Sequence, residues 1–170
     1  MEKTLILDTT LREGEQAPLV HFSETQALQL ARSIDEAGVD FIEISPIVGE
    51  KQRRIAKGML AGGLRSTVVV HCRARKEDIE SVLALDPSFV AIYLSTSDVH
   101  LSHKLHLTRE DALLRAVEMT EFAKSHGLKL RFTCEDASRT ERGYLLDMVR
   151  AVSKAGADRI SITDLSLIHI

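Results

Sequence analysis

The chain has 170 residues, 44% of them hydrophobic and 28% charged, which is typical of one folded domain with enough apolar material for a core. Its formal net charge of −3 supplies no basic patch, so we predict no nucleic-acid partner and no membrane partner. No apolar run approaches the roughly 20 residues of a membrane span. Cys72 and Cys134 lie in strand-like runs, which favours buried free thiols over a disulfide, and we expect a cytoplasmic protein.

Six short runs rich in Val, Ile and Leu alternate with longer segments of helical periodicity. Strands are expected over residues 5–8, 41–45, 67–71, 89–94, 129–133 and 159–163. Helices are expected between Ser23 and Gly38, over 51–60, over 76–84, from Thr108 to Gly127 and over 141–154. Ser23 with Gln26 forms a capping-box pattern at the first helix. This alternation predicts βα units and a parallel sheet.

The polar residues distinguish an open doubly wound sheet from a barrel. They fall at or just beyond the carboxyl ends of all the expected strands, at Asp8, Arg12, Glu13, Ser45, His71, Arg73, Ser95, Ser97, Glu135, Asp136 and Asp164. A doubly wound sheet concentrates its chemistry at one switch point, whereas a barrel collects it from every strand end. No glycine-rich phosphate loop follows the first strand. The sequence therefore predicts an α/β fold, a partial (β/α)8 TIM barrel with strands 1 to 6 only.

Two separated motifs resemble one enzyme family. Residues 7–16 read LDTTLREGEQ, and residues 132–140 read FTCEDASRT. The two motifs resemble the first-strand and fifth-strand signatures of the metal-dependent acyl-condensing barrels, the pyruvate-carboxyltransferase-like family. This family includes homocitrate, 2-isopropylmalate and citramalate synthases and is related to hydroxymethylglutaryl-CoA lyase. The resemblance covers residues 5–164.

The resemblance implies an acyltransferase that condenses acetyl-CoA with a 2-oxo acid in a Claisen-type reaction of amino-acid biosynthesis. A homocitrate synthase-like enzyme is favoured, with a 2-isopropylmalate synthase, a citramalate synthase or a lyase of the same family as alternatives. The family also implies a divalent metal, Mg²⁺, Mn²⁺ or Zn²⁺, and a homodimeric full-length enzyme. A non-catalytic binding or regulatory barrel fragment is the alternative from another class of protein.

The first motif carries three candidate site residues. Glu13 offers a hard oxygen ligand, and the resemblance makes it the first metal ligand. Arg12 is the expected catalytic residue, with a planar guanidinium that suits the oxygens of a 2-oxo acid. Gln16 is the expected substrate contact that accompanies it. The alternative for Arg12 and Glu13 is a plain surface ion pair.

Later strands are expected to select the substrate. By resemblance to homocitrate synthases, His71 and Arg131 bind the far carboxylate of a dicarboxylic 2-oxo acid, and Thr133 and Glu135 line the same pocket. The alternative is that His71 is a hydrogen-bonded strand-end histidine and that Arg131 pairs with a neighbouring acid.

Three histidines, His100, His103 and His106, are spaced three residues apart, as metal ligands on a helix face can be. No carboxylate joins them, so we favour a solvated segment instead. His100 and Lys104 do resemble a recurrent family pattern after the fourth strand, where they can face the substrate.

The resemblance stops after Asp164. The family continues with a seventh strand that carries a His-x-His metal pair, whereas residues 165–170 read LSLIHI. We expect residues 1–164 to be the amino-terminal part of the barrel and residues 165–170 to be a non-native, adapter-derived tail. His169 is therefore not assigned as a metal ligand, and the fragment by itself is expected to be inactive.

Overall fold

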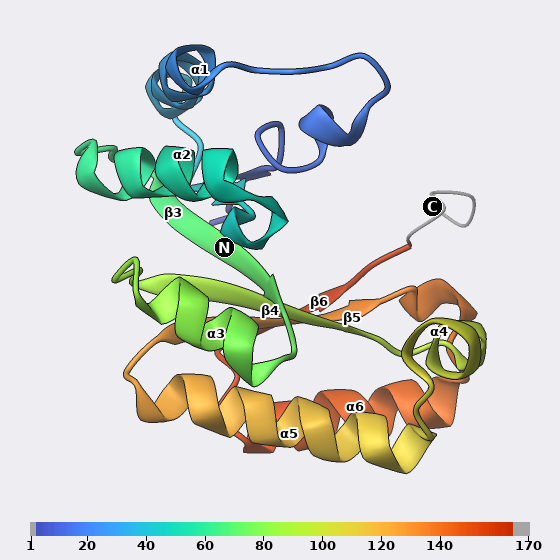
Figure 1. Cartoon of the computed structure of the whole chain (residues 1–170). Helices are drawn as coiled ribbons and strands as arrows, with labels where there is room; N and C mark the ends of the chain where they lie inside the picture. Colours follow the sequence, from blue (N-terminus) through green and yellow to red (C-terminus); the bar gives the residue numbers. More distant parts are fainter. Residues whose placement is uncertain (1–2, 165–170) are drawn as a thin grey trace. The chain divides into compact units, whose positions relative to one another are not determined.

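A computed structural model of the chain describes residues 3–164. Within these residues six strands form one sheet in the order β1-β2-β3-β4-β5-β6. The strands are Leu7–Asp8 (β1), Phe41–Ile44 (β2), Thr67–Arg73 (β3), Phe89–Ser95 (β4), Lys129–Glu135 (β5) and Arg159–Ile162 (β6). The α-helices are Glu24–Glu36 (α1), Glu50–Ala61 (α2), Lys76–Leu83 (α3), Asp98–His100 (α4), Arg109–Ser125 (α5) and Arg142–Lys154 (α6). Strands and helices alternate along the chain (Figure 1), which confirms the α/β class and the partial (β/α)8 pattern with strands 1 to 6.

Four short turns connect these elements. Three are 3-10 turns, at Gly14–Gln16 (η1), Pro46–Val48 (η2) and Ala137–Arg139 (η4). The fourth is a π-helical turn at Leu101–Leu105 (η3), which continues α4. The sequence pattern did not predict these turns, because none is long enough to show an apolar period.

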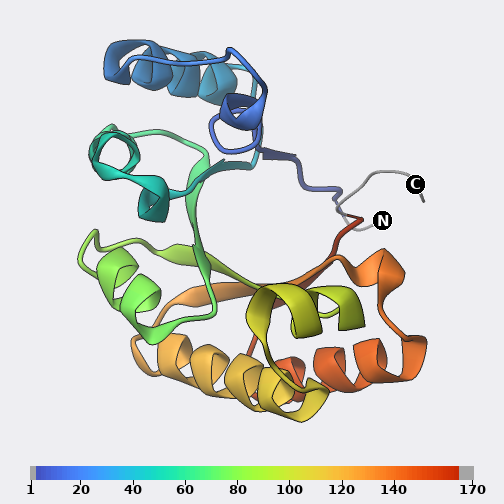
Figure 2. The same cartoon turned by 45° about the vertical axis from the view of Figure 1, so that its right-hand side comes forward.

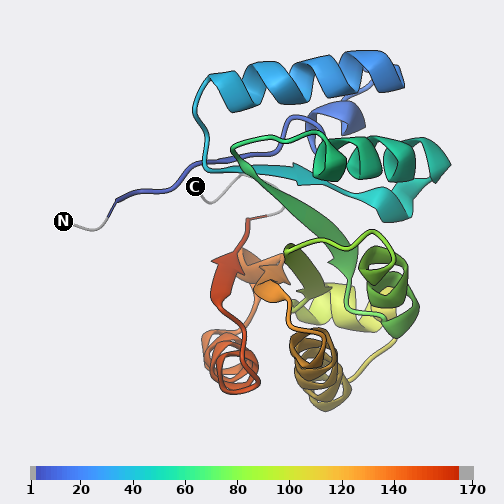
Figure 3. The same ribbon diagram turned by 90° about the vertical axis from the view of Figure 1, so that its left-hand side faces the viewer.

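The first compact unit comprises Met1–Cys72 and Glu80–Phe89. Strands β1, β2 and β3 pair in parallel register within it, and helices α1 and α2 run side by side (Figure 3). The rings of Phe41 and Phe89 meet edge to face with centroids 5.6 Å apart. Other buried side chains of this unit are Ala27, Ala31, Ile42, Ile55 and Met59.

The second compact unit comprises Arg73–Ile79 and the chain from Val90 onward. Strands β5 and β6 are parallel, and helices α5 and α6 lie side by side on one face of them (Figure 2). The buried side chains of this unit include Ala112, Ala116 and Met119 of α5, Met148 and Val152 of α6, and Leu130 and Phe132 of β5. The polar side chains of β5 therefore occupy its other face.

Helix ends follow the local sequence. The Ser23 hydroxyl accepts the Gln26 N–H and the Gln26 side chain accepts the Ser23 N–H, which confirms the predicted capping box. Thr108 and Asp111 make the same reciprocal pair at the start of α5. Gly38 follows α1 with φ of 86°, a left-handed conformation that favours glycine.

Cys72 and Cys134 are buried and are not joined in a disulfide, as predicted. Burial raises the pKa of the Cys134 thiol to about 12, so this thiol stays protonated and unreactive. Among residues 3–164, no helix has the length and apolar character needed to cross a bilayer.

Candidate functional site

The loop after β1 is shaped by its own polar side chains. The Asp8 carboxylate accepts the Thr10 N–H at 2.9 Å and the Thr10 hydroxyl at 3.2 Å, which closes an Asx-type turn. The Thr9 carbonyl then accepts the N–H groups of Arg12 and Glu13 at 3.0 and 2.7 Å. This turn fixes the backbone from which the Arg12 and Glu13 side chains extend.

Arg12 bridges two carboxylates of the first unit. Its Nε donates to Oε1 of Glu43, and its Nη1 donates to Oε2 of Glu13. Glu43 has no exposed side-chain surface, whereas 57% of the Glu13 side chain is exposed. Burying a carboxylate is costly unless it is paired or hydrogen-bonded, and Arg12 supplies a charged donor to Glu43, so this contact holds Arg12 in place. Nη2 of Arg12 makes no hydrogen bond to the described residues 3–164, and its two N–H groups can bind a ligand.

Gln16 joins the same cluster, since its Nε2 donates to Oε2 of Glu13 at 3.3 Å. The structure thus brings Arg12, Glu13 and Gln16 together with Glu43 in a first cluster. A plain surface ion pair would explain the contact of Arg12 with Glu13, but it would not explain the contact with the buried Glu43. His71, near the end of β3, is half-buried, and its carbonyl accepts the Ser45 hydroxyl at 3.1 Å. That bond links the ends of β2 and β3.

A divalent metal needs more ligands than this cluster supplies. Among residues 3–164, no group of three or more His, Cys, Asp or Glu side chains could hold a metal ion. Glu13 is one carboxylate, and Arg12 and Gln16 donate to its Oε2. The described residues alone therefore do not make a complete metal site.

The polar face of β5 carries the other predicted residues. Arg131, Thr133 and Glu135 alternate with Leu130, Phe132 and Cys134, so they share one face of the strand. Thr133 is 6% exposed, and its hydroxyl oxygen has no hydrogen-bond partner among the described residues. A buried hydroxyl without a partner costs free energy, which is expected where a ligand completes the hydrogen bond.

Glu135, at the end of β5, is held through one oxygen. The Ser95 hydroxyl, from the end of β4, donates to its Oε2, and Lys104 Nζ donates to the same atom at 2.9 Å. Nδ1 of His100 lies 3.1 Å from the Ser95 hydroxyl oxygen. Oε1 of Glu135 makes no hydrogen bond within residues 3–164 and remains able to accept one.

Asp136 is the buried carboxylate of a second cluster, which also contains Ser95, Ser97, His100, Glu135 and Arg139. It adopts a left-handed backbone conformation, with φ of 60°, which Asp tolerates better than most residues. Its carboxylate accepts the Ser97 hydroxyl and the Nε of Arg139, the latter at 2.8 Å. Burial by itself would raise the pKa of Asp136, but the hydrogen bonds from Arg139 and Ser97 lower it below its usual value.

Sequence reasoning gave no role to Glu43 or Arg139. Glu43 stands inside the apolar run of β2, and a lone acid within a buried strand is the signal that could have identified it. Asp136, Ser95 and Ser97 were noted as strand-end residues, but their pairing depends on the β4 and β5 ends meeting. No pattern within one strand shows that pairing.

The three spaced histidines do not converge. His103 and His106 are exposed, whereas His100 is half-buried beside Ser95 and Asp136. The exposure of His103 and His106 agrees with the solvated segment expected for them.

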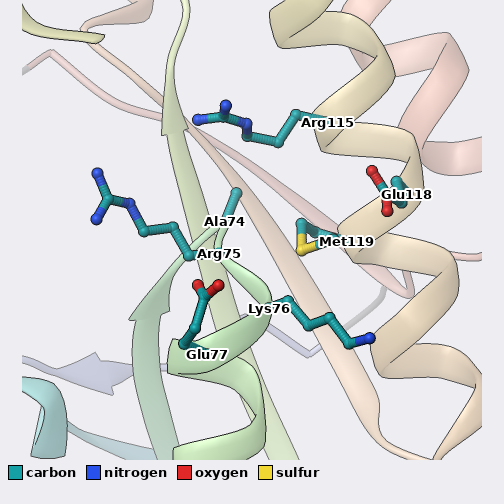
Figure 4. Close-up of a pocket in the computed structure, with 7 residues that line it drawn as sticks. All are labelled: Ala74, Arg75, Lys76, Glu77, Arg115, Glu118 and Met119. Atoms are coloured by element: carbon teal, nitrogen blue, oxygen red, sulfur yellow. The ribbon is translucent and has the colours of Figure 1, made fainter.

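A cavity of about 360 Å³ lies elsewhere in the second unit. It is lined at the β3–α3 junction and on α5 by Ala74, Arg75, Lys76, Glu77, Arg115, Glu118 and Met119 (Figure 4). No predicted site residue lines it, so this cavity does not identify the substrate site.

Comparisons with known proteins place the chain in a family. The HMGL-like family model matches residues 3–166. The homocitrate synthase of Sulfolobus acidocaldarius is 45% identical over 167 residues, covering 95% of this chain and 36% of that protein. A probable 2-isopropylmalate synthase of Ignicoccus hospitalis is 44% identical over 160 residues, covering 94% of this chain and 40% of that protein. The chain thus spans less than half the length of these curated relatives.

Solved structures show the same fold at low identity. The HMG-CoA lyase of Bacillus subtilis superposes with a TM-score of 0.78 at 16% identity, covering 95% of this chain and 58% of that one. The hydroxymethylglutaryl-CoA lyase of Pseudomonas aeruginosa gives a TM-score of 0.77 at 19% identity, with the same coverage of both chains. With the family match over residues 3–166, these findings show that the chain belongs to the HMGL-like family.

Proposed function

We propose that this chain is part of an acyltransferase that condenses acetyl-CoA with a 2-oxo acid, in the manner of a homocitrate synthase. In this reaction a base removes a proton from the acetyl methyl group, and the resulting carbanion attacks C2 of the oxo acid. The new carbon–carbon bond turns the ketone oxygen into an alkoxide, which takes up a proton. Water then cleaves the thioester and releases CoA. The relatives named homocitrate synthase support this choice over a lyase.

The polar face of β5 is the observation that carries the substrate proposal. Arg131, Thr133 and Glu135 place a guanidinium, a buried hydroxyl without a partner and a carboxylate on one side of the strand. An apolar branched side chain would leave the Thr133 hydroxyl without a partner, whereas a second carboxylate on the substrate can bind the Arg131 guanidinium. We therefore propose a dicarboxylic 2-oxo acid of the size of 2-oxoglutarate. The assignment of His71 to the same carboxylate stays a prediction.

The first cluster is proposed to bind the reacting end of the oxo acid. The N–H groups on Nη2 of Arg12 can donate to the oxygens that gain negative charge, and Gln16 can donate beside them. Glu13 would give one ligand to a divalent metal that polarises the ketone. The other ligands must come from outside the described residues, so we propose that the chain by itself does not catalyse the condensation.

The full-length enzyme is further proposed to be a cytoplasmic homodimer with acetyl-CoA and the oxo acid as its ligands. A 2-isopropylmalate synthase is the second candidate, because a relative of that name is 44% identical. The two candidates differ in the substrate side chain that the β5 face must accept.

The test compares kcat/KM for 2-oxoglutarate and 2-oxoisovalerate in the full-length protein. We expect a preference for 2-oxoglutarate, and we expect Arg131→Ala to reduce it on the order of 10- to 100-fold, because a charge-assisted contact is lost. Arg150→Ala removes an exposed arginine of α6 and serves as the control. Better use of 2-oxoisovalerate by the unmutated protein would reassign the substrate to that of a 2-isopropylmalate synthase.

A further inference from the structure

The imidazole of His100 lies between the two carboxylates of the second unit. Its Nδ1 is 3.1 Å from the hydroxyl oxygen of Ser95, which donates to Oε2 of Glu135. Its Nε2 is 3.8 Å from Oδ2 of Asp136 and 3.5 Å from Nη2 of Arg139. The His100 ring thus links Glu135, through the Ser95 hydroxyl, to the buried carboxylate of Asp136.

The number of hydrogens on each group determines which atom donates and which accepts in this series of hydrogen bonds. A serine hydroxyl has one hydrogen and two lone pairs, and the hydrogen of Ser95 is directed to Glu135. The Ser95 oxygen can therefore only accept from its other neighbours. Lys104 Nζ, 3.5 Å away, carries only donors and fits this role. Nδ1 of His100 must likewise carry a hydrogen and donate it to Ser95.

The second ring nitrogen faces a different pair. Nη2 of Arg139 can only donate, so in a neutral ring Nε2 of His100 is the acceptor, which again leaves the hydrogen on Nδ1. Asp136 holds Arg139 in this place, with Nη2 2.8 Å from Oδ2. A protonated ring would also keep Nδ1–H and turn Nε2–H toward Asp136. Both charge states of His100 therefore donate from Nδ1 to Ser95.

We propose that His100 is a positioning residue for Glu135, fixed with its hydrogen on Nδ1 by Ser95 on one side and by the Asp136–Arg139 pair on the other. Because Ser95 and Lys104 both donate to Oε2, the carboxylate is oriented with Oε1 available to a ligand. The hydrogen placement follows from the contacts of the second unit alone. Only the last step, that Oε1 meets the oxo acid, rests on the proposed function.

The hydrogen placement is tested by NMR of the full-length protein with ¹⁵N-labelled histidine rings. At about pH 8.5, where an ordinary imidazole is neutral, long-range ¹H–¹⁵N correlations identify which ring nitrogen carries hydrogen. His100 is assigned by the signal that disappears in His100→Asn. We expect the Nδ1–H tautomer in the unmutated protein and a shift toward Nε2–H only when both constraints are removed, in the double variant Ser95→Ala with Arg139→Ala. A Nε2–H tautomer in the unmutated protein would overturn the proposal.

The positioning role is tested with a matched pair of variants. In His100→Asn the amide N–H stands near the place of Nδ1–H, whereas in His100→Gln it stands near the place of Nε2. We expect His100→Asn to keep KM for the oxo acid within a few-fold and His100→Gln to raise it about tenfold, with a smaller change in kcat. Equal KM values in the two variants would refute the positioning role. Absence of condensation with any oxo acid in the unmutated protein would instead refute the proposed function and leave the NMR result standing.

Discussion

The two units build their polar clusters in different ways. In the first unit one guanidinium, that of Arg12, contacts both the buried Glu43 and the exposed Glu13. In the second unit Glu135 and Asp136 are connected through the Ser95 hydroxyl and the His100 ring. The first arrangement depends on charge neutralisation, and the second depends on the direction of each hydrogen bond.

This difference indicates how each cluster responds to substitution. Removing a cation that compensates a buried carboxylate leaves that charge less well compensated, so substitutions in the first cluster should lower the free energy of unfolding. A hydroxyl–imidazole chain can lose one member and keep its charges paired, since Lys104 and Arg139 remain with Glu135 and Asp136. Substitutions in the second cluster should therefore mainly weaken substrate binding.

The largest effect is expected for Arg12→Ala. Removing the cation leaves Glu43 buried without it, and breaking a buried ion pair typically costs about 3–5 kcal/mol. The free energy of unfolding from urea denaturation of the full-length protein measures this loss. The double variant Arg12→Met with Glu43→Leu removes both charges and should recover most of the stability.

Glu13→Gln is the matched control for that experiment. Its carboxylate contacts the same guanidinium but is 57% exposed, so we expect a loss below about 1 kcal/mol. Equal losses in Arg12→Ala and Glu13→Gln would show that burial of Glu43 does not govern the first cluster.

The fold was largely predictable from the sequence because each element carries a local signal. Apolar runs predicted all six strands, and caps such as Ser23 marked the helix starts. The strand ends were less accurate: β1 covers only Leu7–Asp8 of the expected residues 5–8, and β5 extends to Glu135. Strand ends depend on pairing with neighbouring strands, which a single run of residues does not encode.

The candidate site was predictable only in part. Arg12, Glu13 and Gln16 lie within one short motif, so their proximity follows from the sequence. The Glu43 contact joins residues 31 positions apart, and the Ser95–Glu135 contact joins residues 40 positions apart. Arg12 lies in the loop after β1, and the other three residues lie in different strands, so both contacts depend on how distant segments pack, which no single run of residues encodes.

An intermediate effect on the free energy of unfolding is expected for Asp35, at the end of α1, and it should depend on pH. Its carboxylate accepts the Ser66 N–H at 2.6 Å and the Ser66 hydroxyl at 2.7 Å, which lowers the pKa of Asp35 to about 2. Because an unfolded Asp titrates near about 3.9, Asp35 stabilises the fold above that pH, and this contribution is lost as the pH falls toward 2. Asp35→Asn should therefore be less stable at pH 7 and approach the unmutated protein near pH 2, as measured by urea denaturation at each pH.

Asp158 of the second unit can be compared with Asp35 of the first unit. The pKa of Asp158 is also lowered, but its largest cause is the hydrogen bond from Lys124, a charged donor. Salt screens that interaction more than the neutral bonds to Ser66. The effect of Asp158→Asn should shrink in high salt while that of Asp35→Asn persists, and equal salt dependence would contradict this assignment.

A small effect of opposite sign is expected for Thr133→Val on β5. The Thr133 hydroxyl is buried without a hydrogen-bond partner among residues 3–164, so replacing it with a methyl group removes an unsatisfied polar atom. We expect the free energy of unfolding to rise by about 1 kcal/mol, while KM for the oxo acid rises because the ligand loses a hydrogen bond. Thr120→Val is the control, since the buried Thr120 hydroxyl already donates to the Ala116 carbonyl at 2.7 Å and its loss should not stabilise the fold. A destabilised Thr133→Val variant with an unchanged KM would show that this hydroxyl serves the fold, and the β5 face would then lose its strongest link to a substrate.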